Sequence, residues 1–205
     1  MYEIQLLKQS SPACLFRDIA LLHSREIPEG FLPTLGRNVL IRLYHHIIRN
    51  PRMFVIVAKH GPETVGFICG TEGGSKEFLK FLGRYPASVL WAVFSKLTRP
   101  RTWVKIFELF NYGKQEALRG LPVAELQNFC VASRVHSKGI GQLLFKAACE
   151  EFLSRGISSI RIVTSQNQIK AQNFYERSGA KRAGTMELHR GIPSVIFTLD
   201  ISKSD

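Results

Sequence analysis

Hydrophobic residues follow two different periods along this chain. Short segments rich in apolar and β-branched residues are typical of strands, whereas apolar residues three or four positions apart are typical of amphipathic helices. Turn residues separate these segments; for example, His60 to Glu63 joins two apolar segments into a hairpin. The pattern predicts strands at 2–8, 53–59, 64–70, 123–131, 159–164, 182–188 and 193–201. It predicts helices at 12–24, 33–47, 141–155 and 167–178.

Local signals mark where several of these helices begin and end. Ser11 followed by Pro12 is a capping residue followed by a first-turn proline. Pro33 opens the second helix in the same way. Gly156 and Gly179 stand where the last two helices stop, as expected for C-terminal caps.

The order of these elements indicates an α/β (α+β) fold with a mixed central sheet. Two β-α-β units combine with several hairpins, so helices are expected on both faces of the sheet. A chain of 205 residues is the size of one domain, and it contains no internal repeat. We therefore expect a single domain, 1–205, with a helical insertion at 71–121 between the third and fourth strands.

Composition and charge restrict the kinds of ligand and compartment. Hydrophobic residues make up 45% of the chain, enough for a buried core. The formal net charge of +12 favours an anionic ligand, a nucleic acid or a membrane surface. No purely apolar segment is longer than the one at 89–94, which is far short of the ~20 residues that span a bilayer. With no secretory signal at the start, we expect a cytoplasmic protein.

The four cysteines lie far apart in the sequence, and none forms a C-x-x-C pair. No histidine cluster has the spacing of metal ligands, because His45 and His46 are adjacent and point to different sides of a helix. We therefore expect neither a disulfide framework nor a metal site, which fits a reducing compartment.

The segment from Arg134 to Gly141 lies between a predicted strand and a predicted helix and contains a G-x-G pair. Glycines at a helix start allow close backbone approach and leave N–H groups free to bind a phosphate or diphosphate. Lys138 adds positive charge to the same loop. A Walker loop is excluded because Lys138 precedes its glycine, and the dinucleotide fingerprint is excluded because it needs a third glycine.

Two motifs in this half of the chain resemble those of the GNAT acyltransferases. Val131 to Gly141 (V-x-x-x-x-H-S-K-G-I-G) resembles the acetyl-CoA diphosphate loop of that family, [QR]-x-x-G-x-[GA] after a strand. About thirty residues later, Asn167 to Gly179 resembles the second signature, N-x-x-A-x-x-[LF]-Y-x-x-x-G. The element order also matches, so the resemblance implies a GNAT-like, mostly antiparallel sheet and acetyl-CoA as co-substrate. Departures are His136 in place of the usual Gln or Arg, and Gly179-Ala180 in place of Gly-Phe.

The resemblance implies a set of cofactor-binding residues. In the family the strand before the loop splays from its neighbour and exposes backbone groups to the pantetheine arm. The residues so implied are Phe129, Cys130 and Val131 on the strand, with the Phe129 N–H as a candidate oxyanion donor, and His136, Ser137, Lys138, Gly139, Ile140 and Gly141 in the loop. Asn167 corresponds to a residue that holds a bound water or a CoA carbonyl, although a helix N-cap is an alternative role for it.

Acyl transfer to an amine also needs proton transfer groups. Tyr175 matches the family tyrosine that protonates the departing thiolate; packing against the sheet is the alternative. Glu125 stands where histone-type members carry a general-base glutamate, and strand alternation places it on one face with Gln127, Phe129 and Val131. His189 in the last hairpin is an alternative base. Cys130 as a nucleophile is disfavoured because no His–carboxylate pair is placed to activate it.

The insertion is basic and aromatic. Residues 76–119 hold nine Lys and Arg against three Glu, and include both tryptophans, Trp91 and Trp103. Apolar stripes at 78–82 and 104–110 predict helices. Three interpretations stay open: helices packed on the domain or on a second subunit, a lid that attracts an acidic acceptor, and contact with a membrane surface.

The leading hypothesis is an N-acetyltransferase that transfers acetyl from acetyl-CoA to a primary amine of a small molecule, such as an amino sugar or a nucleotide-linked amino sugar. An anionic acceptor would suit the net charge. A protein N-terminus or lysine is an alternative acceptor, and a homodimer is compatible with the sequence. From another class, a basic module that binds nucleic acid or a membrane surface without turnover would explain the charge, although no nucleic-acid motif supports it.

Overall fold

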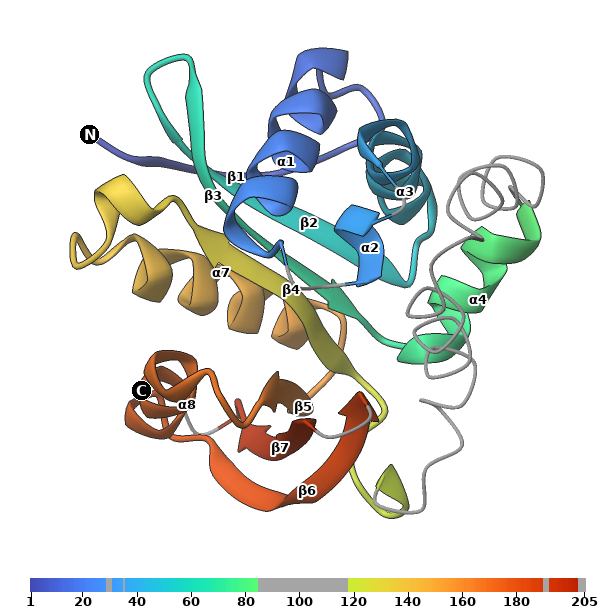
Figure 1. Ribbon diagram of the computed structural model, residues 1–205, viewed down its shortest axis with the longest axis vertical. Helices are drawn as coiled ribbons and strands as arrows, with labels where there is room; N and C mark the ends of the chain where they lie inside the picture. The colour runs from blue at the N-terminus through green and yellow to red at the C-terminus, as the bar shows by residue number, and fades with distance from the viewer. Residues whose placement is uncertain (29–30, 35, 85–117, 190–191, 203–205) are drawn as a thin grey trace.

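The computed structural model describes residues 1–28, 31–34, 36–84, 118–189 and 192–202 (Figure 1). These residues build one seven-stranded sheet flanked by helices. The strands are β1 (Glu3–Leu6), β2 (Met53–His60), β3 (Glu63–Thr71), β4 (Glu125–Val131), β5 (Ser159–Ser165), β6 (Lys181–His189) and β7 (Ile192–Asp200). The helices are α1 (Ala13–Glu26), α2 (Phe31–Thr34), α3 (Arg37–Arg49), α4 (Ser75–Arg84), α7 (Ile140–Ser154) and α8 (Ile169–Arg177).

The predicted mixed, mostly antiparallel sheet is confirmed. Its strand order is β1-β2-β3-β4-β5-β7-β6, and β4–β5 is its parallel pair, while every other neighbouring pair is antiparallel. The strands and helices predicted outside the insertion are present with shifted ends, and one of these helices is divided in two. The parallel pair in the middle of the sheet requires a crossover, which α7 provides.

Two helix starts differ from the prediction. The second predicted helix is divided, because Gly36 takes a left-handed conformation (φ 92°) between α2 and α3. At α1, Pro12 occupies the N-cap position, and the hydroxyl of Ser11 instead accepts the backbone N–H of Lys8 at 2.9 Å. Both helix starts follow from local backbone geometry, which the spacing of hydrophobic residues does not specify.

The core lies in two layers, one on each face of the sheet. Helices α1 and α3 cover one face and α7 covers the other (Figure 1). On the α1 side, Tyr44 from α3 meets Phe67 from β3 edge-on. On the α7 side, Phe152 meets Phe54 from β2 with ring centroids 4.9 Å apart. Between these layers, the sheet is least continuous at β4 and β5, which pair at only two positions.

The insertion begins with a helix that is anchored to the domain. Glu77 on α4 is 1% exposed and accepts hydrogen bonds from Asn50 (2.6 Å) and Lys80 (2.9 Å). Burial acts against ionisation of Glu77, but these hydrogen bonds and the charges of Lys80 and Arg52 outweigh it and lower its pKa. The second predicted helical stripe, both tryptophans and the interpretations built on them lie in 85–117, outside the described residues. Among the described helices, none is long and apolar enough to cross a bilayer.

A buried histidine in the α1 layer makes the stability of the fold depend on pH. His23 is 1% exposed, and its Nδ1 lies 2.5 Å from the hydroxyl oxygen of Tyr44. Burial lowers the pKa of His23 from 6.5 to about 4. The unfolded chain therefore takes up a proton near pH 6.5 that the folded protein does not take up until about pH 4. This stability contribution is complete above pH 6.5 and is lost as the pH falls towards 4.

We expect the free energy of unfolding to drop by about 2 to 3 kcal/mol through this histidine between pH 7 and pH 4.5. Urea unfolding at the two pH values measures the drop. His23→Gln, which keeps a hydrogen-bonding group near Tyr44 but does not titrate, should show a smaller drop than the wild type. His60→Gln, at an exposed turn, is the matched control and should behave as the wild type. Equal drops in all three proteins would contradict the assignment.

Candidate active site

Strands β4 and β5 separate soon after they begin. They pair only at Glu125 with Arg161 and at Leu126 with Ile162, although each strand has seven residues. Beyond Leu126, the edge of β4 that faces β5 is open, as the diverging ribbons show (Figure 1). The splay expected from the resemblance is therefore present.

A β-bulge in β4 changes which side chains share a face. Ile68 of β3 pairs with Phe129, and Gly70 pairs with Leu126, so β4 has one residue more than β3 in this interval. Leu126 and Phe129 therefore share the α7 face of the sheet, and Glu125 lies on the other face. The prediction that Glu125 and Phe129 share a face is wrong, because simple alternation does not continue through a bulge.

The backbone of β4 directs its polar groups alternately to β3 and to the open edge. Ala132 donates its N–H to the carbonyl of Val65 at 2.8 Å, which identifies this pair as hydrogen-bonded across to β3. Counting back along the ladder, Phe129 and Val131 point their N–H and C=O groups to the open edge. Part of that edge is already used, since His136 Nε2 donates to the Val131 carbonyl at 2.9 Å. The Phe129 N–H thus faces the opening, as an oxyanion donor must.

The loop after β4 turns its backbone amides towards the same opening. Ser137 (φ 62°) and Gly139 (φ 75°) are left-handed, a conformation that gathers successive N–H groups on one side. Gly139 is the N-cap of α7, and neither a capping side chain nor an acidic residue occupies the first turn of this 15-residue helix. Its first N–H groups and its dipole therefore suit an anionic group such as a diphosphate.

Gly141 keeps this helix start accessible. A Cβ at this position would lie 3.7 Å from the rings of both Phe129 and Phe174, in ordinary contact with them. The hydrogen of glycine thus leaves a space between β4 and α8 that a larger side chain would fill. This cradle fits the passage of a pantetheine arm from the helix start to the open edge.

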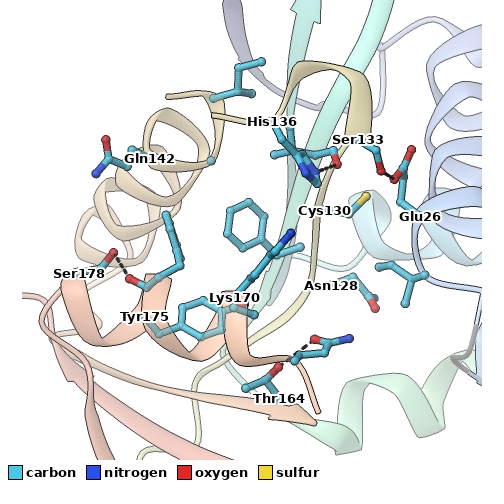
Figure 2. Close-up of a pocket in the computed structure, with 18 of the residues that line it drawn as sticks. Glu26, Asn128, Cys130, Ser133, His136, Gln142, Thr164, Lys170, Tyr175 and Ser178 are labelled. Carbon is cyan, nitrogen blue, oxygen red and sulfur yellow. Dashed lines mark hydrogen bonds between the residues drawn. The ribbon is translucent and has the colours of Figure 1, made fainter. Parts of the chain in front are cut away.

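A cleft of about 1120 Å³ connects these features (Figure 2). Most of the predicted site residues line it: Phe129, Cys130, Val131, His136, Ser137, Gly139, Ile140, Gly141 and Tyr175. Lys138, Asn167 and Glu125 are not among the lining residues. The cleft reaches both faces of the sheet, because Phe129 lies on the α7 face and Cys130 on the α1 face. One continuous space thus runs around the open edge of β4.

Tyr175 lies on α8 at the wall of this cleft. It is 6% exposed and contacts the rings of Phe145, Phe174 and Phe197. Burial raises the pKa of its phenol well above the ordinary value of 10. The phenol therefore keeps its proton at neutral pH, which is the form that a general acid needs. This placement shows the packing role, and it is compatible with the proton donation that the resemblance implies.

Asn167 neither lines the cleft nor caps α8. It is exposed, its N–H donates to the hydroxyl of Ser165 at 3.3 Å, and α8 begins later with Gln168 as N-cap. The neighbouring Gln168 lines the cleft instead and accepts a hydrogen bond from Thr164 at 3.0 Å. A signal for this was in the sequence, since the family signature places its polar residue three positions before Ala171, which is Gln168.

Glu125 is engaged in a buried ion pair. Its carboxylate lies 2.8 Å from Nε and 2.7 Å from Nη2 of Arg161, and both residues are 5% exposed. Arg161 also donates to the carbonyl of Pro122 at 3.2 Å. The pair joins β4 to β5 one residue before the last paired position, Leu126 with Ile162. The carboxylate is thus held by Arg161, and Glu125 is not among the residues that line the cleft.

Cys130 is not supported as a nucleophile by the structure, and His189 stays an untested alternative base. Burial and the charge of Glu26 raise the pKa of the Cys130 thiol well above its usual range, so the thiol is protonated at neutral pH. His189 ends β6, and its side chain lies outside what the structure describes. Within the described ranges, no group of three or more His, Cys, Asp and Glu is placed to hold a metal ion.

Comparisons with known proteins agree with this geometry. No curated protein matches the chain. An aminoglycoside 6'-N-acetyltransferase solved with coenzyme A has a TM-score of 0.61, 16% identity and 99% coverage of both chains. The ribosomal-protein-S18-alanine N-acetyltransferase from Escherichia coli has a TM-score of 0.59 and 12% identity, over 100% of this chain and 97% of its own. An aminoglycoside 6'-acetyltransferase type Ii has a TM-score of 0.60, 18% identity and 99% coverage of both chains.

These likenesses show the fold, and the family model shows the family. The model of the acetyltransferase (GNAT) family matches residues 17–180, which include the splayed strand, the loop after it and the whole of the second motif. The chain therefore belongs to the GNAT family and is an acetyl-CoA-dependent N-acetyltransferase.

Proposed function

We propose that this enzyme transfers acetyl to a primary amine of a small molecule, by direct attack of the amine while both substrates are bound. The observation that carries the proposal is the single cleft around the open edge of β4. It joins an anion-binding helix start on one face of the sheet to a separate pocket wall on the other. Two substrates can therefore meet at the Phe129 backbone without a covalent enzyme intermediate, which the protonated thiol of Cys130 also disfavours.

The described residues suit each part of acetyl-CoA. The amides from Ser137 to Gly141 and the α7 dipole would hold the diphosphate. The open edge at Phe129 and Val131 would pair with the amides of the pantetheine arm as a further strand would. Lys170 on α8 lines the cleft, with its amino group directed inward, and adds positive charge for the phosphates (Figure 2).

The reaction requires one bond to form and one to break. The amine nitrogen bonds to the acetyl carbonyl carbon, the carbon–sulfur bond breaks, nitrogen loses one proton and sulfur gains one. The Phe129 N–H would stabilise the negative charge on the carbonyl oxygen. Tyr175 would donate a proton to sulfur as the carbon–sulfur bond breaks, and burial keeps its phenol protonated at neutral pH until then. Solvent then returns a proton to Tyr175.

We propose a positioning role for Glu125 in place of the general-base role. The buried pair with Arg161 holds β4 against β5 at the point where they begin to separate, and so sets the width of the cleft. Removing one member of such a pair leaves an uncompensated buried charge, which is strongly destabilising. We therefore expect the conservative change Glu125→Gln to lower the free energy of unfolding. The kcat of the protein that remains folded should change little.

The acceptor class rests on the cleft and not on the solved structures, whose titles name acceptors as different as an aminoglycoside and a ribosomal protein. A protein N-terminus or lysine stays the alternative acceptor. The net charge alone also allowed a basic binding module without turnover. Membership of the GNAT family indicates an enzyme instead.

The proposal is tested by a screen of primary amines with release of the CoA thiol as readout. Acetyl-CoA alone should raise the melting temperature, because a ligand that binds only the folded state stabilises it. Turnover with a small amine, and none with peptides bearing free N-termini or lysines, supports the proposed acceptor. The opposite preference would assign a protein acceptor, and no shift in melting temperature at millimolar acetyl-CoA would contradict the cofactor site.

A further inference from the structure

The α1 side of the cleft carries a carboxylate that the proposed chemistry has not used. Glu26, Ile27 and Pro28 form this wall, at the end of α1 and just beyond it. Glu26 is the one acidic side chain among the described residues that line the cleft. Figure 2 shows it across Cys130 and Asn128 from α8, on the opposite side from Tyr175.

Glu26 stands at the negative end of a helix. It is the last residue of α1, where the helix dipole is negative, so its own charge adds to that of the dipole. Two basic residues lie in this last turn, and neither neutralises it well. His23 is buried with a pKa of about 4 and so is neutral at pH 7. Arg25 lies 3.9 Å away with its side chain 70% exposed, and such surface pairs contribute little.

The carboxylate is nevertheless held in one orientation. Ser133, in the turn that follows β4, donates its hydroxyl to Glu26 Oε2 at 2.6 Å. The side chain of Glu26 is only 11% exposed, while Ser133 and the hydrogen bond itself lie at the exposed rim of the cleft. The result is a fixed negative centre in a chain whose net charge is +12. Such a centre attracts a cation more strongly than an exposed carboxylate does.

We propose that Glu26 binds an ammonium group of the acceptor beside the neutral amine that reacts, and thereby selects amines that carry a further positive charge near the reacting nitrogen. This inference rests on the proposed function and specifies its substrate class. The charges along the cleft are divided accordingly, with Lys170 and Arg177 on α8 and Glu26 on α1. An acceptor with a phosphate or carboxylate beside its amine would be repelled at this wall, although the net charge of the chain alone favours anions.

The test compares steady-state kinetics of the wild type and Glu26→Gln with four probes at saturating acetyl-CoA. Spermidine and kanamycin are cationic, an alanyl peptide amide has one positive charge, and glucosamine 6-phosphate is anionic. We expect the wild type to prefer the cationic probes. Glu26→Gln should raise their KM about tenfold or more, with a smaller effect on kcat and none on the KM for acetyl-CoA.

Two further variants separate ligand binding from a merely structural role. Ser133→Ala leaves the charge but frees the carboxylate, so it should raise the amine KM by a smaller factor, roughly two- to fivefold. Glu150→Gln on the exposed side of α7 makes the same change of charge and should match the wild type. A structural role for the Glu26–Ser133 contact would instead change the melting temperature and the KM for acetyl-CoA.

The outcomes also distinguish this inference from the proposed function. An unchanged amine KM in Glu26→Gln, or a preference of the wild type for glucosamine 6-phosphate, would overturn the role of Glu26 while turnover still upheld the transferase with a small acceptor. Wild-type protein whose melting temperature does not respond to acetyl-CoA would overturn the cofactor site itself, whatever Glu26 does.

Discussion

Tyr175→Phe is expected to lower kcat by roughly 100-fold or more, with the Kd for acetyl-CoA within twofold of the wild type. The substitution removes only the phenolic oxygen. The ring contacts with Phe145, Phe174 and Phe197 remain, so α8 should keep its position against the sheet. What is lost is the proton that the departing thiolate would take. Single-turnover kinetics with acetyl-CoA and an amine from the screen, together with calorimetric titration of CoA, measure the two quantities.

The pKa of Tyr175 adds a second expectation to this variant. Because burial raises that pKa above its usual value of 10, loss of the phenolic proton should not lower the wild-type rate between pH 7 and 9. Tyr2→Phe removes a hydroxyl close to the N-terminus, far from the cleft, and serves as the matched control. A kcat for Tyr175→Phe within twofold of the wild type would leave Tyr175 with a packing role only.

Gly141→Val is expected to weaken the binding of acetyl-CoA on the order of 100-fold while the protein stays folded. The added side chain begins at the Cβ position 3.7 Å from Phe129 and Phe174, and so fills the space between the helix start and the open edge. The backbone at Gly141 is not left-handed, and valine is a better helix residue than glycine, so α7 itself should not be destabilised. The loss would therefore come from the ligand and not from unfolding.

Calorimetric titration with CoA measures this effect, and thermal unfolding in the absence of ligand checks the fold. Gly83→Val adds the same side chain to an exposed helical glycine of α4, where a Cβ meets nothing within 4 Å, and should bind CoA as the wild type does. Undiminished binding in Gly141→Val would show that the diphosphate and pantetheine do not pass this point, and the proposed course of the cofactor would be wrong.

The sequence alone was sufficient for the elements and for the family. Hydrophobic periodicity predicted the strands and helices, since burial on one face imposes a period on the residues of an element. Two motifs at a fixed distance indicated the diphosphate loop and the helix that bears Tyr175, because each motif is local in the chain and its backbone geometry follows from its own residues.

Only the tertiary structure decided how the site is assembled. The bulge in β4 moved Glu125 to the other face from Phe129, and bulges depend on pairing with a neighbouring strand that no local pattern specifies. Arg161, the partner of Glu125, is 36 residues away in sequence. The role of Glu26 has no sequence signal either, because its proximity to Ser133 spans 107 residues and arises only when α1 packs over the end of β4. Periodicity reports which side of an element is buried, whereas contacts between distant elements determine which charges meet in the cleft.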